Sequence, residues 1–307
     1  MTAFAFKPAK REQIALLLGM VGGTGSGKTF SAMELATGLA GDKPFAVIDT
    51  ETGRAKHYAD QFRFDHGDLK PPFRPDAYID AIEAADKAGY SVVVVDSTSH
   101  VWAGDGGVLD WQEDEFQRMG ARDAAKMASW IKPKMAHKQM VQKLLQVRAH
   151  VILCFRAEEK IEMVRNSVGK MEVVPKKSPT GLHGWMPVCE KNLPFELTAS
   201  FLLTADAPGI PKPIKLQAQH RPMVPLDKPI TRATGAALAA WARGGEAKAP
   251  PSPDKETLLK QLRLAASHGT ASLDADWNDL SGLEKKIVGQ VGIDSLRADA
   301  KKADEEA

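Results

Sequence analysis

The stretch GGTGSGKT at residues 22–29 follows an apolar run at residues 14–20 and precedes a segment with helical spacing at residues 28–39. It matches the pattern G-x-x-x-x-G-K-[ST] at each fixed position. Its glycines let the backbone curl so that several N–H groups point at one centre, and the start of a helix adds partial positive charge there. The pattern therefore predicts a phosphate-binding loop between a strand and a helix.

Further apolar runs at residues 45–49, 92–96 and 150–155 lack polar alternation, which is typical of parallel strands buried on both faces. Segments with helical spacing lie between them, at residues 76–87 and, as one helix or a pair, at residues 108–147. This order predicts an α/β fold with a mostly parallel central sheet flanked by helices.

The composition changes near residue 244. Residues 1–243 form the predicted α/β core, residues 244–253 are rich in Gly, Pro and Ala and predict a flexible linker, and residues 254–307 show helical spacing only. The last part predicts a small helical interaction domain. Its Trp277, Leu280 and Leu283 would form either its own core or a partner-binding face.

The chain has 307 residues, 43% of them hydrophobic and 26% charged, with two cysteines and no CxxC motif. These values exclude a disulfide scaffold and a wholly disordered chain, and they disfavour a zinc site. No apolar run approaches the roughly 18 residues of a membrane span, and the N-terminal residues lack the apolar stretch of a secretory signal. We therefore expect a cytoplasmic protein.

The loop predicts a site for ATP and Mg²⁺. Lys28 would reach the phosphates, and Thr29 would offer its hydroxyl to Mg²⁺. Asp96, at the end of the run VVVVD on a neighbouring strand, would hold Mg²⁺ through water. The residues expected to bind the nucleotide are Gly22, Gly23, Thr24, Gly25, Ser26, Gly27, Lys28, Thr29 and Phe30.

An ATPase also needs a group that orients the attacking water. Ser97 occupies the position directly after Asp96, where AAA+ proteins place a glutamate. Glu51 instead follows the run FAVID, just beyond the tip of what we expect to be the strand next to the phosphate loop. A carboxylate there could orient the water, and the alternative is a solvated loop glutamate.

The combination of GGTGSGKT, the pair Asp49-x-Glu51 and VVVVDS resembles the RecA-like P-loop ATPase core. It resembles in particular the AAA-family ATP-binding proteins that phages encode beside their single-strand annealing and recombination genes. The resemblance implies ATP hydrolysis coupled to single-stranded DNA, a homo-oligomeric ring or filament, and cooperation with a single-strand-binding protein. Bacterial RecA carries an Asn-Gln pair where this chain has Arg156 after its fourth run, a departure that favours annealing over strand exchange.

Two arginines are implied by the resemblance. Arg156 would lie near the γ-phosphate and sense it, with a surface pair to Glu158 or Glu159 as the alternative. Arg221, in a strand-like segment, would reach the nucleotide of a neighbouring subunit, with Lys212 and Lys215 as competitors for that role.

Residues 124–157 contain no acidic side chain, and a Gly- and Pro-containing segment with further basic residues follows them. Trp130 and His137 lie among these charges, so the region could follow phosphates and stack a base, although solvated lysines are the alternative. The candidate DNA-binding residues are Lys126, Lys132, Lys134, Lys138, Lys160, Arg165, Lys170, Lys176 and Lys177. The pattern Phe6-x-x-Ala9 resembles a subunit-docking peptide, or it is an apolar tail that packs on its own core.

The net charge of +2 hides an asymmetry. Residues 1–243 carry 32 basic and 27 acidic side chains, whereas residues 254–307 carry 8 and 11. A basic core with an acidic tail fits a DNA-stimulated ATPase. Two other functions stay open at this point, an ATP-gated assembly or switch factor without direct DNA action and a small-molecule kinase with scattered arginines.

Overall fold

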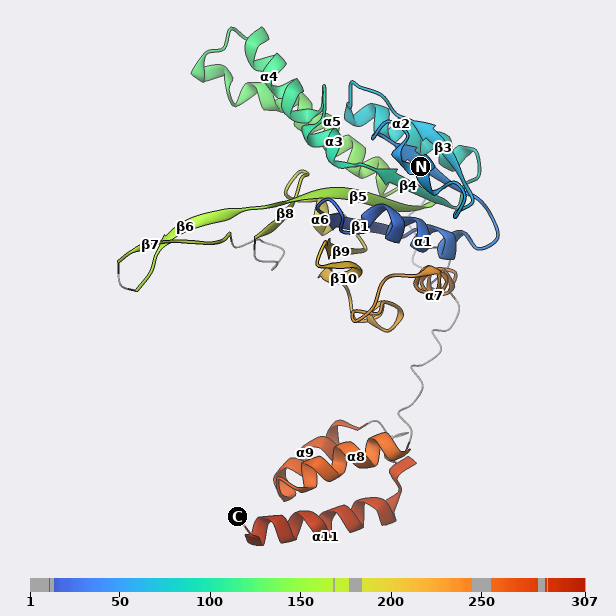
Figure 1. Cartoon of the computed structure of the whole chain (residues 1–307), viewed down its shortest axis with the longest axis vertical. Helices are drawn as coiled ribbons and strands as arrows, with labels where there is room; N and C mark the ends of the chain where they lie inside the picture. Colours follow the sequence, from blue (N-terminus) through green and yellow to red (C-terminus); the bar gives the residue numbers. More distant parts are fainter. Residues whose placement is uncertain are drawn as a thin grey trace, which may run out of the picture. The chain divides into compact units, whose positions relative to one another are not determined.

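The computed structural model describes residue 11 and residues 14–167, 169–176, 184–244, 255–280, 285 and 287–306. The chain divides into two compact units, Met1–Gly245 and Glu246–Ala307. The first unit is built on one sheet and the second on helices alone within its described residues (Figure 1).

The sheet of the first unit has the strand order β10-β9-β1-β5-β4-β2-β3. Every neighbouring pair in this order is parallel except β10 and β9. The strands are β1 (Leu17–Gly22), β2 (Phe45–Asp49), β3 (Phe64–Asp68), β4 (Val92–Asp96), β5 (His150–Glu159), β9 (Ala199–Thr204) and β10 (Ala207–Lys215). The prediction of a mostly parallel α/β sheet is confirmed.

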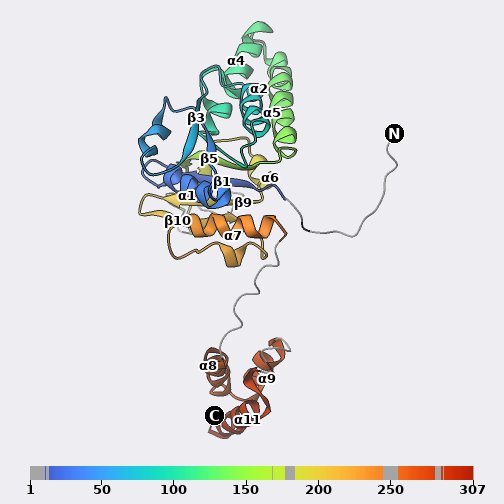
Figure 2. The same ribbon diagram turned by 90° about the vertical axis from the view of Figure 1, so that its right-hand side faces the viewer.

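Helices cover both faces of this sheet (Figure 2). One face carries α1 (Lys28–Ala40) and α7 (Arg232–Ala242), and the other carries α2 (Pro75–Lys87) and α5 (Ile131–Leu144). The position of β4 in the sheet explains why its sequence shows no polar alternation. Val92 and Val94 belong to the core under α1, whereas Val93 and Val95 belong to the core under α2, so both faces of the strand are buried.

The helix that follows the phosphate loop is held against α7 by two glycines. A Cβ atom at Gly38 would lie 2.0 Å from the carbonyl oxygen of Arg232, and one at Gly235 would lie 2.2 Å from the carbonyl oxygen of Leu35. Any larger side chain would push the two backbones apart. The close contact fixes α1, and with it the loop at its N-terminus.

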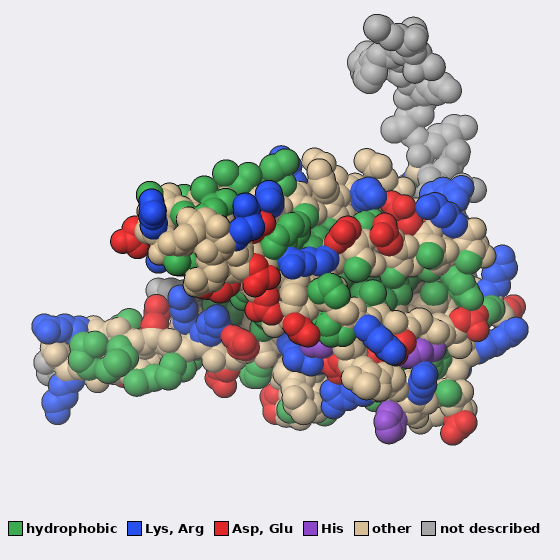
Figure 3. Space-filling model, turned by 90° about the horizontal axis from the view of Figure 1, so that it is seen from above, with side chains coloured by type: hydrophobic (Ala, Val, Ile, Leu, Met, Phe, Trp, Pro, Cys, Tyr) green, Lys and Arg blue, Asp and Glu red, His purple; other side chains and the backbone are tan. Residues whose placement is uncertain are grey.

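Strand β5 continues beyond the sheet. Its far end pairs with β8 (Trp185–Pro187), and after Lys160 the chain forms an antiparallel hairpin of β6 (Ile161–Arg165) and β7 (Met171–Pro175). This β6–β7 hairpin projects from the body of the unit (Figures 1 and 3). A single run of chain therefore joins the centre of the sheet to an exposed arm.

Residues 108–147 form two helices, α4 (Val108–Arg118) and α5, with 3-10 turns between them, which confirms the second of the two predicted arrangements. Three other sequence-based predictions need correction. Strand β5 extends to Glu159 rather than ending at Phe155. The prediction that β2 lies next to the phosphate-loop strand is wrong, because β5 and β4 separate β2 from β1. Strand β4 is likewise not an immediate neighbour of β1, since β5 lies between them.

The second unit contains α8 (Lys255–Ala266), α9 (Thr270–Asp279) and α11 (Gln290–Glu306). Leucines of all three helices form its core, and Trp277 and Leu280 pack against that core. Leu283 lies outside the described residues. Among the described residues, no helix combines the length and apolar character that crossing a membrane requires.

Candidate active site

The phosphate loop lies at the carboxyl end of β1. Gly25 and Gly27 have φ angles of 76° and 78°, in the left-handed region that favours glycine. A Cβ atom at Gly22 would lie 2.5 Å from both the carbonyl oxygen of Leu203 and the hydroxyl of Ser26. The conformation of the loop therefore requires glycine at these positions. The loop ends at Lys28, where α1 begins.

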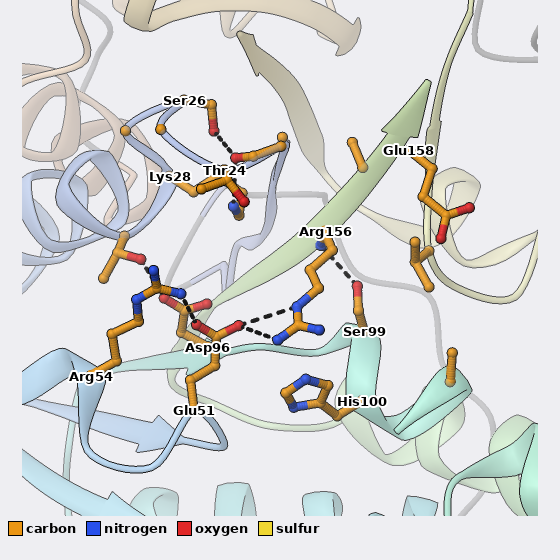
Figure 4. A pocket seen from close by; sticks show the side chains of 18 of the residues that line it. Thr24, Ser26, Lys28, Glu51, Arg54, Asp96, Ser99, His100, Arg156 and Glu158 are labelled. Atoms are coloured by element: carbon orange, nitrogen blue, oxygen red, sulfur yellow. Dashed lines mark hydrogen bonds and ion pairs between the residues drawn. The ribbon is translucent and has the colours of Figure 1, made fainter. Parts of the chain in front are cut away.

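A cavity of about 720 Å³ opens above this loop (Figure 4). It is bordered by the carboxyl ends of β1, β4 and β5 and by the segment that follows β2, where ligands bind in open α/β sheets. The side chains and loop residues that line it are Gly22, Gly23, Thr24, Gly25, Ser26, Gly27, Lys28, Thr29, Glu51, Arg54, Tyr58, Asp96, Ser99, His100, Ala103, Arg156, Ala157, Glu158 and Val188.

Three candidate groups for phosphate and Mg²⁺ meet in this cavity. The hydroxyl of Thr29 donates a hydrogen bond to Oδ2 of Asp96 at 2.6 Å. The ammonium of Lys28 donates to the carbonyl oxygen of Gly23 at 3.2 Å, inside the loop. A hydroxyl and a carboxylate are hard oxygen ligands, so the pair Thr29–Asp96 fits Mg²⁺.

Asp96 is only 6% exposed, and burial raises the pKa of its carboxyl group even though Thr29 donates to it. A cation near this carboxylate would compensate its buried charge. Among the described residues, no cluster of three or more His, Cys, Asp or Glu side chains could hold a metal ion by itself. The remaining ligands of a cation here would have to be water and phosphate oxygens.

Glu51 lies opposite the phosphate loop, and both oxygens of its carboxylate are engaged. Arg54 Nη1 donates to Oε2 at 2.7 Å, and Arg156 Nη2 and Nε donate to Oε1 at 2.8 and 3.2 Å. Figure 4 shows the two guanidinium groups approaching Glu51 from opposite sides. With 13% of its side chain exposed, Glu51 is not a solvated loop glutamate.

The charge of Glu51 follows from these contacts. Burial alone would raise its pKa, but the hydrogen bonds and the positive charges of Arg54 and Arg156 outweigh burial and hold the pKa below its ordinary value. The carboxylate is therefore ionised at neutral pH.

Asp49 shapes the segment that presents Glu51. Its Oδ1 accepts the backbone N–H of Glu51 at 2.6 Å, and its Oδ2 accepts the N–H of Ala55 at 2.8 Å. An aspartate that binds backbone amides beyond itself in this way fixes a turn. Asp49 thus fixes the turn that presents Glu51 to the cavity.

Arg156 lines the cavity. Its ion-pair partner is neither Glu158 nor Glu159, the two that the sequence suggested. It pairs with Glu51, while Glu158 pairs with Lys160 at 3.5 Å. Its backbone N–H donates to the hydroxyl of Ser99 at 2.8 Å. The side chain of Arg156 is therefore held by Glu51, and its backbone is held by Ser99 at the start of the helix after β4.

The lining residues that were not among the predicted site residues include Arg54, Tyr58 and His100. Phe30, which the sequence placed among the nucleotide-binding residues, does not line the cavity, but its ring lies beside that of Tyr58 with centroids 6.1 Å apart. No local motif marks Arg54, Tyr58 or His100. Only the spacing of Arg54, three positions after Glu51, could have suggested an ion pair.

The other candidate residues lie elsewhere. Arg221 lies in a 3-10 turn, not in a strand, and does not line the cavity. Lys212 bonds to Thr204 and Lys215 to the carbonyl oxygen of Phe195, also outside the cavity.

The basic candidates for DNA binding are exposed on α5, on the turns before it and on the β6–β7 hairpin, and Lys177 lies outside the described residues. Lys132 pairs with Glu115. The expected base-stacking role of His137 is wrong, because its side chain is buried, with a relative exposure of 4%. Trp130 is half-buried and stacks on Trp102.

Comparison with known proteins gives one positive result. A family model described as an AAA domain matches residues 15–186, which include the phosphate loop, Glu51, Asp96, Arg156 and the β6–β7 hairpin. No curated protein matches the chain.

Proposed function

The chain belongs to the AAA-domain family of P-loop nucleotide-binding proteins, and we propose that it is a Mg²⁺-dependent, RecA-like ATPase that acts on single-stranded DNA. Its role would be strand annealing or homologous recombination of the kind that phages encode, carried out by a homo-oligomer. The observation that carries the ATPase proposal is the meeting of Lys28, Thr29, Asp96 and Glu51 around one cavity.

Each of these residues has a distinct part in the proposed hydrolysis. The loop N–H groups and Lys28 bind the phosphates and neutralise their charge. Thr29 and Asp96 hold Mg²⁺, which when bound polarises the phosphate oxygens. Glu51 orients a water molecule toward the γ-phosphorus and takes its proton, and the bond between that phosphorus and ADP breaks.

The contacts of Glu51 suggest how nucleotide binding is sensed. Arg156 shares its charge with Glu51. A γ-phosphate offers the same guanidinium a second anion, so Arg156 would divide its hydrogen bonds between the two. This exchange would release one oxygen of Glu51 for water.

The adenine base has a candidate site as well. Tyr58 lines the cavity and Phe30 lies next to it, at the start of α1 and beside the phosphate loop. An aromatic pair can stack a base whatever its identity. We therefore expect these two rings to contact the base.

The β6–β7 hairpin is the candidate DNA-contacting arm. Ile161, Met163, Met171 and Val173 share one of its faces and are each more than half exposed, and Arg165 and Lys170 lie at its far end. Figure 3 shows this hydrophobic patch with basic side chains at the end of the arm. Because Arg156 and the hairpin follow one another along β5 and β6, nucleotide sensing and DNA contact would be linked through a few residues of chain.

This proposal predicts that Arg165→Ala with Lys170→Ala weakens binding of a fluorescent single-stranded oligonucleotide about tenfold, measured by anisotropy. The slope of log affinity against log salt should become shallower by about 1.4, because two phosphate contacts are lost and each contributes about 0.7 on a single strand. The matched control is Lys70→Ala with Lys87→Ala, which removes the same charge at exposed positions on the core. Equal losses in both double variants would contradict a specific role of the hairpin.

We also propose that the protein acts as a homo-oligomer. Arg221 is exposed and lies outside the cavity of its own subunit, so its proposed contact is with the nucleotide of a neighbouring subunit. The helical unit, with its net negative charge, is the proposed attachment point for a partner such as a single-strand-binding protein.

A second function is favoured by the apolar character of the hairpin. An exposed patch of Ile, Met and Val is also typical of protein-docking surfaces. In that case the chain would be an ATP-gated assembly or switch factor whose hairpin binds a protein. An ATPase rate that does not respond to DNA would favour this alternative.

A further inference from the structure

His100 lies in the cavity beside Glu51 and Arg156 but has no part in the steps above (Figure 4). It belongs to α3 (Ser99–Ala103), the short helix that follows β4. Two contacts fix its imidazole ring. Nδ1 lies 2.7 Å from the hydroxyl oxygen of Thr50, and the ring stacks on Phe73 with centroids 5.0 Å apart and planes 27° apart. The ring is therefore held in one orientation before any ligand binds.

The hydroxyl of Thr50 joins the ring to the segment that follows β4. It accepts the backbone N–H of Ser97 at 2.8 Å and lies 3.2 Å from the carbonyl oxygen of the same residue, which also accepts a hydrogen bond from the hydroxyl of Tyr78 at 3.0 Å. A hydroxyl has one proton, so it donates either to this carbonyl oxygen or to Nδ1 of His100. In the tautomer that the proposal below requires, it donates to the carbonyl oxygen, Nδ1 donates to Thr50, and Nε2 carries a lone pair.

The surroundings keep the ring uncharged. Burial lowers the pKa of His100, and the positive charge of Arg156 lowers it further, while Glu51 acts in the opposite direction and is outweighed. At neutral pH the ring of His100 is therefore uncharged and does not bind anions as Arg156 can. In the tautomer given above, its Nε2 accepts a hydrogen bond.

We propose that Nε2 of His100 accepts a hydrogen bond from the water that attacks the terminal phosphate, so that His100 and Glu51 fix this water together. The inference rests on the proposed ATP hydrolysis. An attacking water has two hydrogens, and directing one to each acceptor turns its oxygen lone pair toward phosphorus. In the reaction the water oxygen bonds to phosphorus, the bond to the oxygen of ADP breaks with its electron pair, and the water proton passes to Glu51. His100 orients the water throughout and stays neutral.

The full-length variants His100→Gln and His100→Asn separate this role from a structural one. Both remove the ring and its stacking on Phe73. The Gln amide reaches the position of Nε2 and can offer an oxygen there, whereas the shorter Asn amide reaches only the position of Nδ1, next to Thr50. We expect the kcat of His100→Asn to fall about a hundredfold and that of His100→Gln to stay within about tenfold of the unchanged protein.

Binding is the second readout. The affinity for a non-hydrolysable ATP analogue, measured by calorimetry, and the KM for ATP should change less than about threefold in both variants, because the water contact serves the reaction rather than binding. A Gln variant as slow as the Asn variant would overturn the proposal, as would an Asn variant with unchanged kcat or a loss of analogue binding that accounts for the slower turnover. If the unchanged protein binds the analogue but hydrolyses no ATP, the proposed function itself is contradicted.

Discussion

Lys28→Ala is expected to abolish ATP hydrolysis, with turnover falling at least about a thousandfold. Lys28 is the only lysine that lines the cavity among the described residues, and its ammonium already lies within the phosphate loop, 3.2 Å from the carbonyl oxygen of Gly23. Without it, the charge that develops on the β- and γ-phosphates during cleavage would lose its nearest side-chain cation. The measurement is phosphate release at saturating Mg²⁺ and ATP.

The control for this change is Lys56→Ala, which removes an exposed lysine near the site but outside the cavity lining. It should leave turnover unchanged. Because the hydrogen bond of the Lys28 ammonium stays within the phosphate loop and joins no separate element of the fold, we expect the variant to keep its unfolding temperature. A Lys28→Ala protein that hydrolyses ATP at an ordinary rate would show that another site does the chemistry.

Glu51→Gln is expected to separate binding from turnover. The amide keeps the size of the side chain but lacks the charge that attracts the water proton, so hydrolysis should slow by about a hundredfold to ten-thousandfold. ATP should bind at least as tightly, because Arg54 and Arg156 lose their shared anion and become available to phosphate. A filter-binding assay with labelled ATP, followed by analysis of the bound nucleotide, measures both effects.

Glu158→Gln provides the matched control for this change. Glu158 lines the same cavity and pairs with Lys160, so the substitution removes the same charge from the lining of that cavity. It should leave hydrolysis nearly unchanged. If Glu51→Gln hydrolyses ATP normally, the water is oriented by another group and the RecA-like assignment is wrong.

The parts of this site that the sequence predicts are those fixed by neighbours along the chain. A glycine loop between a strand and a helix defines its own geometry, and an aspartate at the end of an apolar strand emerges at the carboxyl edge of a parallel sheet. Thr29 and Asp96 could therefore be placed together although 67 positions separate them, and they meet at 2.6 Å. The two-sided burial of β4 was likewise visible in its unbroken run of valines.

The parts that the sequence does not predict depend on strand order and on long-range pairing. Nothing local shows that β5 lies between β1 and β4, and this insertion brings Arg156 to Glu51 across 105 positions. The edge strand β3 was missed because its sequence, FDHGD, contains one large apolar residue and three polar ones. The stacking role expected for His137 failed because α5 turns that residue toward the interior, where Trp102 contacts it.

In the proposed function, ATP hydrolysis in this cavity responds to single-stranded DNA. The steady-state ATPase rate of the full-length protein at low salt, titrated with an unstructured single-stranded oligonucleotide, measures this response. We expect the rate to rise with DNA concentration, to saturate, and to return to its basal value as salt is added, because salt weakens phosphate contacts. A basal rate that stays constant over the whole titration, in a protein that hydrolyses ATP through Lys28 and Glu51, would contradict the proposed response.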